Sequence, residues 1–141
     1  MLRQFLIGGA ASIGNIVIHA LVMAEIVWAV QIVRARHTGR PSLLLIVIMI
    51  VTVWILMAAH ASEVAVWALV YAVVDAARPG AGLMYFAFVN YTTLGYGDIT
   101  PAERWQLLGP MTAMNGVLLF GWSTAVIFEA MRGAMRSAAA E

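Results

Sequence analysis

Three long apolar runs separated by short polar segments dominate the hydrophobic pattern of this chain. They cover residues 4–33, 43–74 and 105–132. Because about 20 apolar residues suffice to cross the hydrocarbon core of a bilayer, each run predicts a transmembrane helix. A fourth apolar run, residues 83–92, is too short to span the bilayer. It predicts a re-entrant half-helix, which enters the membrane and returns on the same side.

The polar segments between these runs contain residues that end and start helices. Residues 34–40 form a basic loop, and Pro41 cannot continue the preceding helix. Ser42 is a candidate N-cap for the second helix, and Thr100 is a candidate cap for the last one. The second loop covers residues 75–82.

The first apolar run has an alternative interpretation as a cleaved signal peptide, because Arg3 precedes it and small residues occur at positions 8–12. The run continues far beyond the usual length of a signal-peptide core, which favours a retained helix. His19 and Glu25 interrupt it. Since ionisable residues at membrane depth usually face protein or water, each of the two marks a candidate helix contact.

The composition predicts an all-α integral membrane protein. The chain has 141 residues, of which 63% are hydrophobic and 11% charged, and its mean hydropathy is +0.91. A soluble domain of this size cannot bury so much apolar surface. The net charge of +1 gives no reason to expect a nucleic-acid partner. The chain has no cysteine, no phosphate loop and no nucleophile–base pair, so we expect neither enzyme activity nor a cofactor.

The arginine positions predict the orientation in the membrane. Three arginines lie within residues 34–40, and Arg132 and Arg136 follow the last span. By the positive-inside rule both regions are cytoplasmic. We therefore expect a multi-pass protein of the cell inner (plasma) membrane, with its N-terminus outside and its C-terminus cytoplasmic.

A polar, glycine-bearing segment, residues 92–98, follows the short helix. Irregular backbone at membrane depth persists only where it lines a cavity or binds a ligand, because unpaired N–H and C=O groups cost several kcal/mol each. Carbonyl oxygens that face one axis can replace the water shell of a dehydrated cation. The candidate oxygens belong to Thr93, Leu94, Gly95 and Tyr96, with the Thr93 hydroxyl as one more. Gly95 and Gly97 supply the backbone freedom that this conformation requires.

The segment Thr92-Thr93-Leu94-Gly95-Tyr96-Gly97-Asp98 resembles the selectivity filter of the tetrameric potassium channels. Leu94 departs from the valine that is usual in this family; it keeps the carbonyl but alters the packing behind it. The resemblance implies a pore module at residues 37–136, with outer helix, pore helix, filter and inner helix, and leaves residues 1–36 as an additional transmembrane helix. It also implies a homotetramer, because one chain offers one filter strand, and potassium ions as the permeant ligand.

The resemblance also directs attention to the residues that support the filter. Val89 and Phe86 stand where family members carry a bracing glutamate and tryptophan, and neither side chain can form the corresponding hydrogen bond. Asp98 lies at the outer mouth, where it concentrates cations. The predicted support residues are Thr92, Asp98, Glu63 and His60.

His60, Glu63 and Trp67 fall on one face of the second helix, at about the depth of the filter. We hypothesise that Glu63 takes over part of the bracing role. Its candidate partners are Asn90, Tyr91 and Thr92. The alternative is an interfacial His–Glu pair that joins two helices. The sequence disfavours a metal site here, since two ligands rarely suffice.

The last helix carries candidate gating residues. Gly116 and Gly121 either let the helix bend or allow close packing against a neighbour. Glu129 and Arg132, three residues apart, form either an intrahelical pair or a latch between subunits on an inner gate.

The sequence thus predicts a potassium-selective channel subunit that conducts passively as a homotetramer in the lipid bilayer. One alternative is a weakly selective cation channel, because Leu94 and the missing bracing residues soften the filter. Another is a non-conducting scaffold or accessory subunit that retains the pore module. A secondary transporter would show internal repeats and broken helices in both halves, which this sequence lacks.

Overall fold

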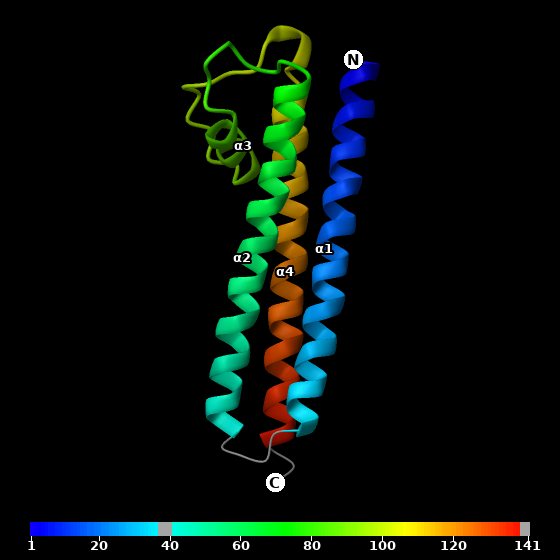
Figure 1. The fold of residues 1–141 in the computed structure, drawn as a ribbon, viewed down its shortest axis with the longest axis vertical. Helices are drawn as coiled ribbons and strands as arrows, with labels where there is room; N and C mark the ends of the chain where they lie inside the picture. Colours follow the sequence, from blue (N-terminus) through cyan, green and yellow to red (C-terminus); the bar gives the residue numbers. More distant parts are fainter. Residues whose placement is uncertain (37–40, 139–141) are drawn as a thin grey trace.

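The protein is built from helices in the computed structural model, which describes residues 1–36 and 41–138 (Figure 1). The elements are α1 (Leu2–Arg36), α2 (Pro41–Val73), α3 (Leu83–Tyr91), a 3-10 turn η1 (Glu103–Trp105) and α4 (Leu108–Ala138). The long helices α1, α2 and α4 are each long and apolar enough to cross a membrane. They run alternately in opposite directions, so the N-terminus and α3 lie at one end of the molecule and the last turn of α4 at the other.

The structure confirms the predicted spans but corrects two predicted caps. α2 begins at Pro41, so Ser42 lies in its first turn and does not cap it; the fixed φ of proline suits the first helical position. α4 begins at Leu108, after η1, so Thr100 does not cap it either. Pro110 fits in the first turn of α4, where no backbone N–H is needed. Residues 37–40 of the predicted basic loop lie outside the described residues.

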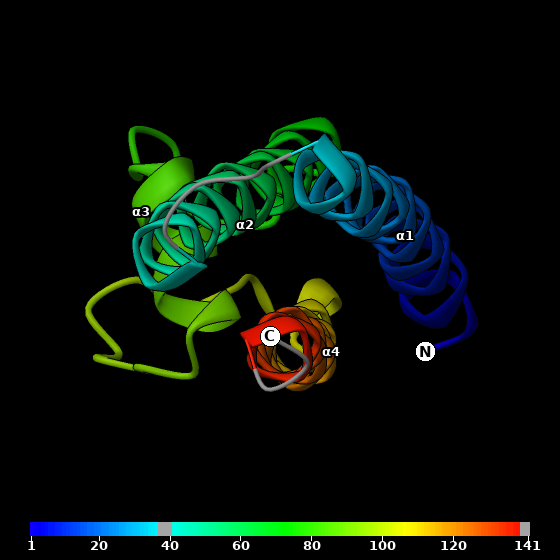
Figure 2. The same cartoon turned by 90° about the horizontal axis from the view of Figure 1, so that it is seen from below.

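The short helix α3 packs against α2 and α4, and α1 packs against α2 and α4 on a different side (Figure 2). A core of aromatic and aliphatic side chains fills the end of the molecule where α3 lies. Its largest members are Trp67, Tyr71, Phe86, Tyr91 and Leu108. A smaller cluster of Met23, Ile26 and Leu56 joins α1 and α2 nearer the other end. The core therefore fixes α3 in place from two sides.

Large apolar side chains remain exposed along the outer faces of all three long helices. Examples are Phe5, Trp28, Trp54, Leu69 and Leu118. Contiguous apolar surface on this scale marks contact with lipid or with another subunit. The outer surface is therefore that of a multi-pass membrane protein.

Candidate functional site

The backbone of residues 92–98 leaves α3 in an unusual conformation. φ is positive at Thr93 (60°), Gly95 (61°) and Gly97 (79°), and the residues between them do not share this sign. Alternation of this kind lets consecutive carbonyls point toward one side. Thr93 is β-branched, and for such a residue a positive φ costs roughly 1–3 kcal/mol. This strain persists only where the surrounding structure enforces it.

In this segment, backbone N–H groups form hydrogen bonds within the described residues, whereas the backbone carbonyl groups do not. The amide of Thr93 donates to the Asn90 carbonyl (3.0 Å), and the amides of Leu94 and Gly95 donate to the Val89 carbonyl (2.9 and 3.3 Å). Among the hydrogen bonds of the described residues, none ends on a carbonyl of residues 93–96. The donors are thus tied to the end of α3, while the carbonyl oxygens stay free for another ligand.

Electrostatics at this segment favour a cation. The C-terminal end of α3, which carries the negative end of the helix dipole, leads directly into it. At its far end, Asp98 is exposed. A hydrogen bond with the Asp98 carboxylate raises the pKa of the Tyr85 phenol. Phe86, at the position where family members carry the bracing tryptophan, is buried in the core, whereas Tyr85 is exposed. On α3, therefore, Tyr85 and not Phe86 is the residue that contacts Asp98.

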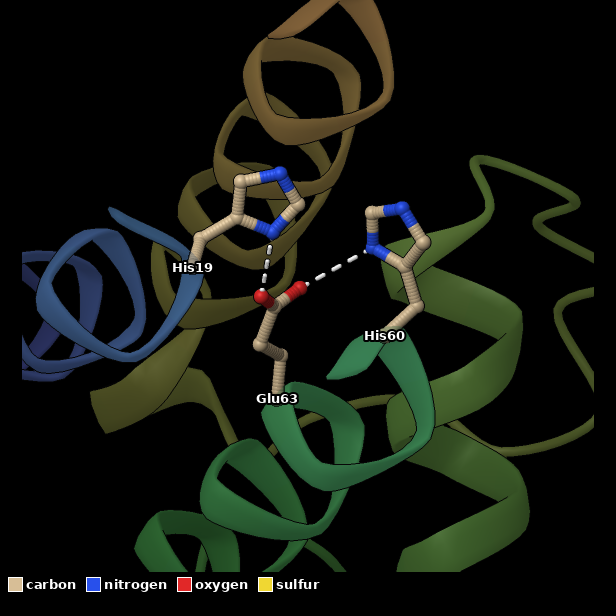
Figure 3. A group of neighbouring side chains, drawn as sticks. All are labelled: His19, His60 and Glu63. Carbon is tan, nitrogen blue, oxygen red and sulfur yellow. Dashed lines mark hydrogen bonds and ion pairs between the residues drawn. The ribbon is translucent and has the colours of Figure 1, made fainter. Parts of the chain in front are cut away.

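A buried carboxylate, Glu63, lies at the centre of a polar cluster, between His19 and His60 (Figure 3). Its Oε1 is 2.7 Å from His19 Nδ1, and its Oε2 is 3.0 Å from His60 Nδ1. The Tyr91 hydroxyl also donates to Oε2. The side chains of His19 and Glu63 are fully buried. We call His19, His60, Glu63 and Tyr91 the Glu63 cluster.

The other ring nitrogens of both histidines meet at one hydroxyl. Ser123 Oγ is 2.9 Å from His60 Nε2 and 3.2 Å from His19 Nε2. With Ser123, the Glu63 cluster connects α1, α2, α3 and α4. It therefore joins the four α-helices of the described chain at one point.

A second set of hydrogen bonds lies beside this cluster. Asn15 Nδ2 donates to the Glu63 backbone carbonyl (3.2 Å) and to Asn115 Oδ1 (3.0 Å). Trp67 Nε1 donates to the same Asn115 oxygen (3.0 Å). All four residues are buried. Because each hydrogen bond spans two helices, this set holds α1 and α4 against the face of α2 that carries Glu63.

A family model described as ion channel matches residues 59–133, more than half of the chain. The chain belongs to this ion channel family. The channel chain matches no curated protein and no solved structure. The matched range includes α3, residues 92–98, most of α4 and the part of α2 that carries Glu63. α1, with His19, lies outside it.

The channel structure places Glu63 against Tyr91, one of its three candidate partners. The other two do not bond to it. Asn90 Nδ2 donates to the Phe86 carbonyl, and the Thr92 hydroxyl donates to the Phe88 carbonyl. The sequence did not predict that Asn15, Asn115 and Ser123 take part in these hydrogen bonds. The sequence offered only one indication of such contacts, namely a polar residue within an apolar run. It marked His19 as a candidate helix contact but did not identify the residue that His19 contacts.

The two candidate hinge glycines of the channel differ in their surroundings. A Cβ added at Gly116 would lie 2.1 Å from the Tyr91 carbonyl oxygen, whereas no atom of the described residues lies within 4 Å of one added at Gly121. Gly116 is therefore needed for the close approach of α4 to the end of α3. Near the other end of α4, Glu129 Oε2 and Arg132 Nη2 are 3.2 Å apart and both side chains are exposed. Within the chain this is an ordinary intrahelical pair.

Proposed function

We propose that the protein is the subunit of a potassium-selective channel that conducts potassium passively as a homotetramer. One observation carries the proposal: the carbonyls of residues 93–96 are free of internal hydrogen bonds within the described chain, and φ alternates along their backbone. A ring of such carbonyls replaces the hydration shell of a potassium ion. One chain provides only one strand of the ring, so identical subunits must share an axis.

The exposed side chains of the same segment support assembly. Leu94 and Tyr96 are 54% and 68% exposed in the single chain. Two large side chains of this kind, two residues apart in a polar segment, suit burial against an adjacent subunit. In the tetramer, residues 37–136 form the pore module. In that module α2 is the outer helix, α3 the re-entrant pore helix and α4 the inner helix.

The arrangement of the termini supports the proposed orientation. The N-terminus lies at the same end as α3, and the last turn of α4 lies at the opposite end (Figure 1). Combined with the arginine positions in the sequence, this favours an N-terminus and filter outside and a C-terminus in the cytoplasm of a plasma-membrane protein. The proposed partners are potassium ions, the lipid bilayer and three further copies of the chain. We propose neither a cofactor nor a nucleic-acid partner.

Cation flux into proteoliposomes tests the proposal, with potassium, rubidium and sodium compared under the same gradient. We expect potassium and rubidium to enter and sodium to be excluded. Gly95→Ala should abolish the flux, because φ at position 95 is 61° and a Cβ strains that conformation. Gly14→Ala in α1 is the matched control, since nothing lies within 4 Å of the added Cβ.

Two results would replace this proposal by an alternative. Equal sodium and potassium flux that Gly95→Ala still abolishes would identify a weakly selective cation channel. No flux of any cation from protein shown to be tetrameric would favour a non-conducting scaffold that retains the module.

A further inference from the structure

Three side chains with metal-ligating atoms converge inside the helix bundle. His19, His60 and Glu63 each offer one ligand atom, and these atoms all lie within 4.8 Å of one another. Both imidazole rings turn one nitrogen toward the carboxylate (Figure 3). The Tyr91 oxygen, 3.0 Å from His60 Nδ1, is a fourth ligand atom at the same point. The sequence placed only His60 and Glu63 at one site. In the structure α1 supplies the third ligand, His19.

The hydrogen count of this cluster points to a bound cation. Ser123 Oγ lies within hydrogen-bond distance of Nε2 of both rings but has a single hydrogen to donate. At least one ring must therefore carry its own hydrogen on Nε2. If that ring is neutral, its Nδ1 turns a lone pair toward a Glu63 oxygen at 2.7 or 3.0 Å. Two lone pairs repel each other at this distance, so the contact requires either a proton or a metal ion between them.

We propose that His19, His60 and Glu63 bind a divalent transition-metal ion, with Tyr91 as the fourth ligand and Zn²⁺ as the best-fitting ion. Two imidazole nitrogens and a carboxylate form a common ligand set for Zn²⁺, completed by a fourth oxygen. In the bound state both histidines are neutral and both Nε2 hydrogens are donated to Ser123. Such an outer hydrogen bond fixes the tautomer of a ligating histidine.

Charge balance supports the same site. Glu63 is fully buried at membrane depth, where an uncompensated carboxylate is costly. A divalent ion neutralises it, and the second charge is balanced when the Tyr91 hydroxyl binds the ion as a phenolate and its proton is released to bulk water. The metal would join α1 to α2 and to the end of α3, two residues before Thr93. The inference goes beyond the proposed function, because the site does not depend on potassium selectivity.

The test measures metal content and Co²⁺ absorption on the full chain, purified in detergent with a tag that contains no histidine. Cells are grown with added zinc, so that the ion is present while the bundle folds. We expect one zinc per chain, replacement by Co²⁺ with a tetrahedral spectrum, and a melting midpoint that falls on chelation. His19→Gln should lose the ion. The control Glu25→Gln, an exposed acid on α1, should keep it.

Ser123→Ala provides a second variant that leaves all four ligands in place. It should weaken metal affinity by about 10–100-fold, the usual effect of losing an outer hydrogen bond. If His19→Gln fails to fold, Ser123→Ala and the Co²⁺ spectrum of the unmodified chain still test the proposal. The proposal is overturned if the unmodified chain binds no stoichiometric Zn²⁺ or Co²⁺, if Co²⁺ remains octahedral, or if His19→Gln keeps the ion. In these cases the cation between the lone pairs is a proton.

Discussion

Replacement of Gly116 by alanine should push α4 away from the end of α3. The added Cβ would lie 2.1 Å from the Tyr91 carbonyl oxygen and 3.0 Å from its carbonyl carbon. Carbon–oxygen contacts in proteins lie at about 3.3–3.6 Å, so the two backbones must separate by roughly 1 Å. Because the obstacle is backbone, no side-chain rotation relieves the contact.

The expected cost has two parts. Overpacking of a well-packed interior costs about 1–3 kcal/mol. The separation also weakens the hydrogen bond from Tyr91 to the Glu63 carboxylate, and hydrogen bonds to charged groups contribute about 1.5–3 kcal/mol. Alanine recovers about 1 kcal/mol through its better helix propensity. A net loss of about 1.5–5 kcal/mol in the free energy of unfolding follows.

Unfolding of the purified protein in detergent, by heat and by denaturant, measures this loss. Gly121→Ala is the matched control on the same helix, because an added Cβ there meets nothing within 4 Å. It should be neutral or stabilise the chain by up to about 1 kcal/mol. If Gly116→Ala is as stable as Gly121→Ala but changes gating, the close-approach argument is refuted and Gly116 is a hinge.

Three further predictions concern the polar contacts. Glu63→Ala should cost about 3–5 kcal/mol of unfolding free energy, because it removes the shared partner of two histidines and a tyrosine; Glu63→Gln should cost less, and equal losses would contradict the bracing role. Tyr71→Phe, which removes a 2.6 Å hydrogen bond to Thr112, should cost about 0.5–1.5 kcal/mol, and a double-mutant cycle with Thr112→Val should show coupling. Asp98→Asn should lower the raised pKa of Tyr85 toward the ordinary tyrosine value in an NMR titration; an unchanged pKa would disprove their contact.

The long helices were predictable because their signal is local. Each apolar run exceeds the length that a bilayer requires, so α1, α2 and α4 follow from composition alone. Their ends were less predictable. Ser42 and Thr100 have good capping side chains, but Pro41 starts its helix directly and η1 intervenes before α4. The path that the chain takes between helices, and not the capping side chain, determines where these two helices begin.

The candidate site was predictable where its residues share one helix, and Tyr91 was one of three candidate partners of Glu63 from a second helix. His60 and Glu63 were found by their spacing of three on α2. Asn15 and Asn115 are 100 residues apart, and His19 and Glu63 are 44 apart. Whether such residues meet depends on how far each helix is shifted along its neighbours. Side-chain packing determines this shift, and it cannot be predicted from a local sequence pattern. The contact of Tyr85 with Asp98 was not predicted for a related reason, because it requires the chain to turn back after α3.

The Glu63 cluster changes how the first helix is to be understood. Residues 1–36 lie outside the family match and form a separate span in the sequence. Yet Glu63 is fully buried because α1 covers it and supplies His19 and Asn15 as hydrogen-bond partners. Without α1, this carboxylate would lose the helix that covers it and both of these hydrogen-bond partners, which is costly at membrane depth. The boundary predicted at residue 36 therefore separates two membrane spans in the sequence, but the hydrogen bonds from His19 and Asn15 to Glu63 cross it.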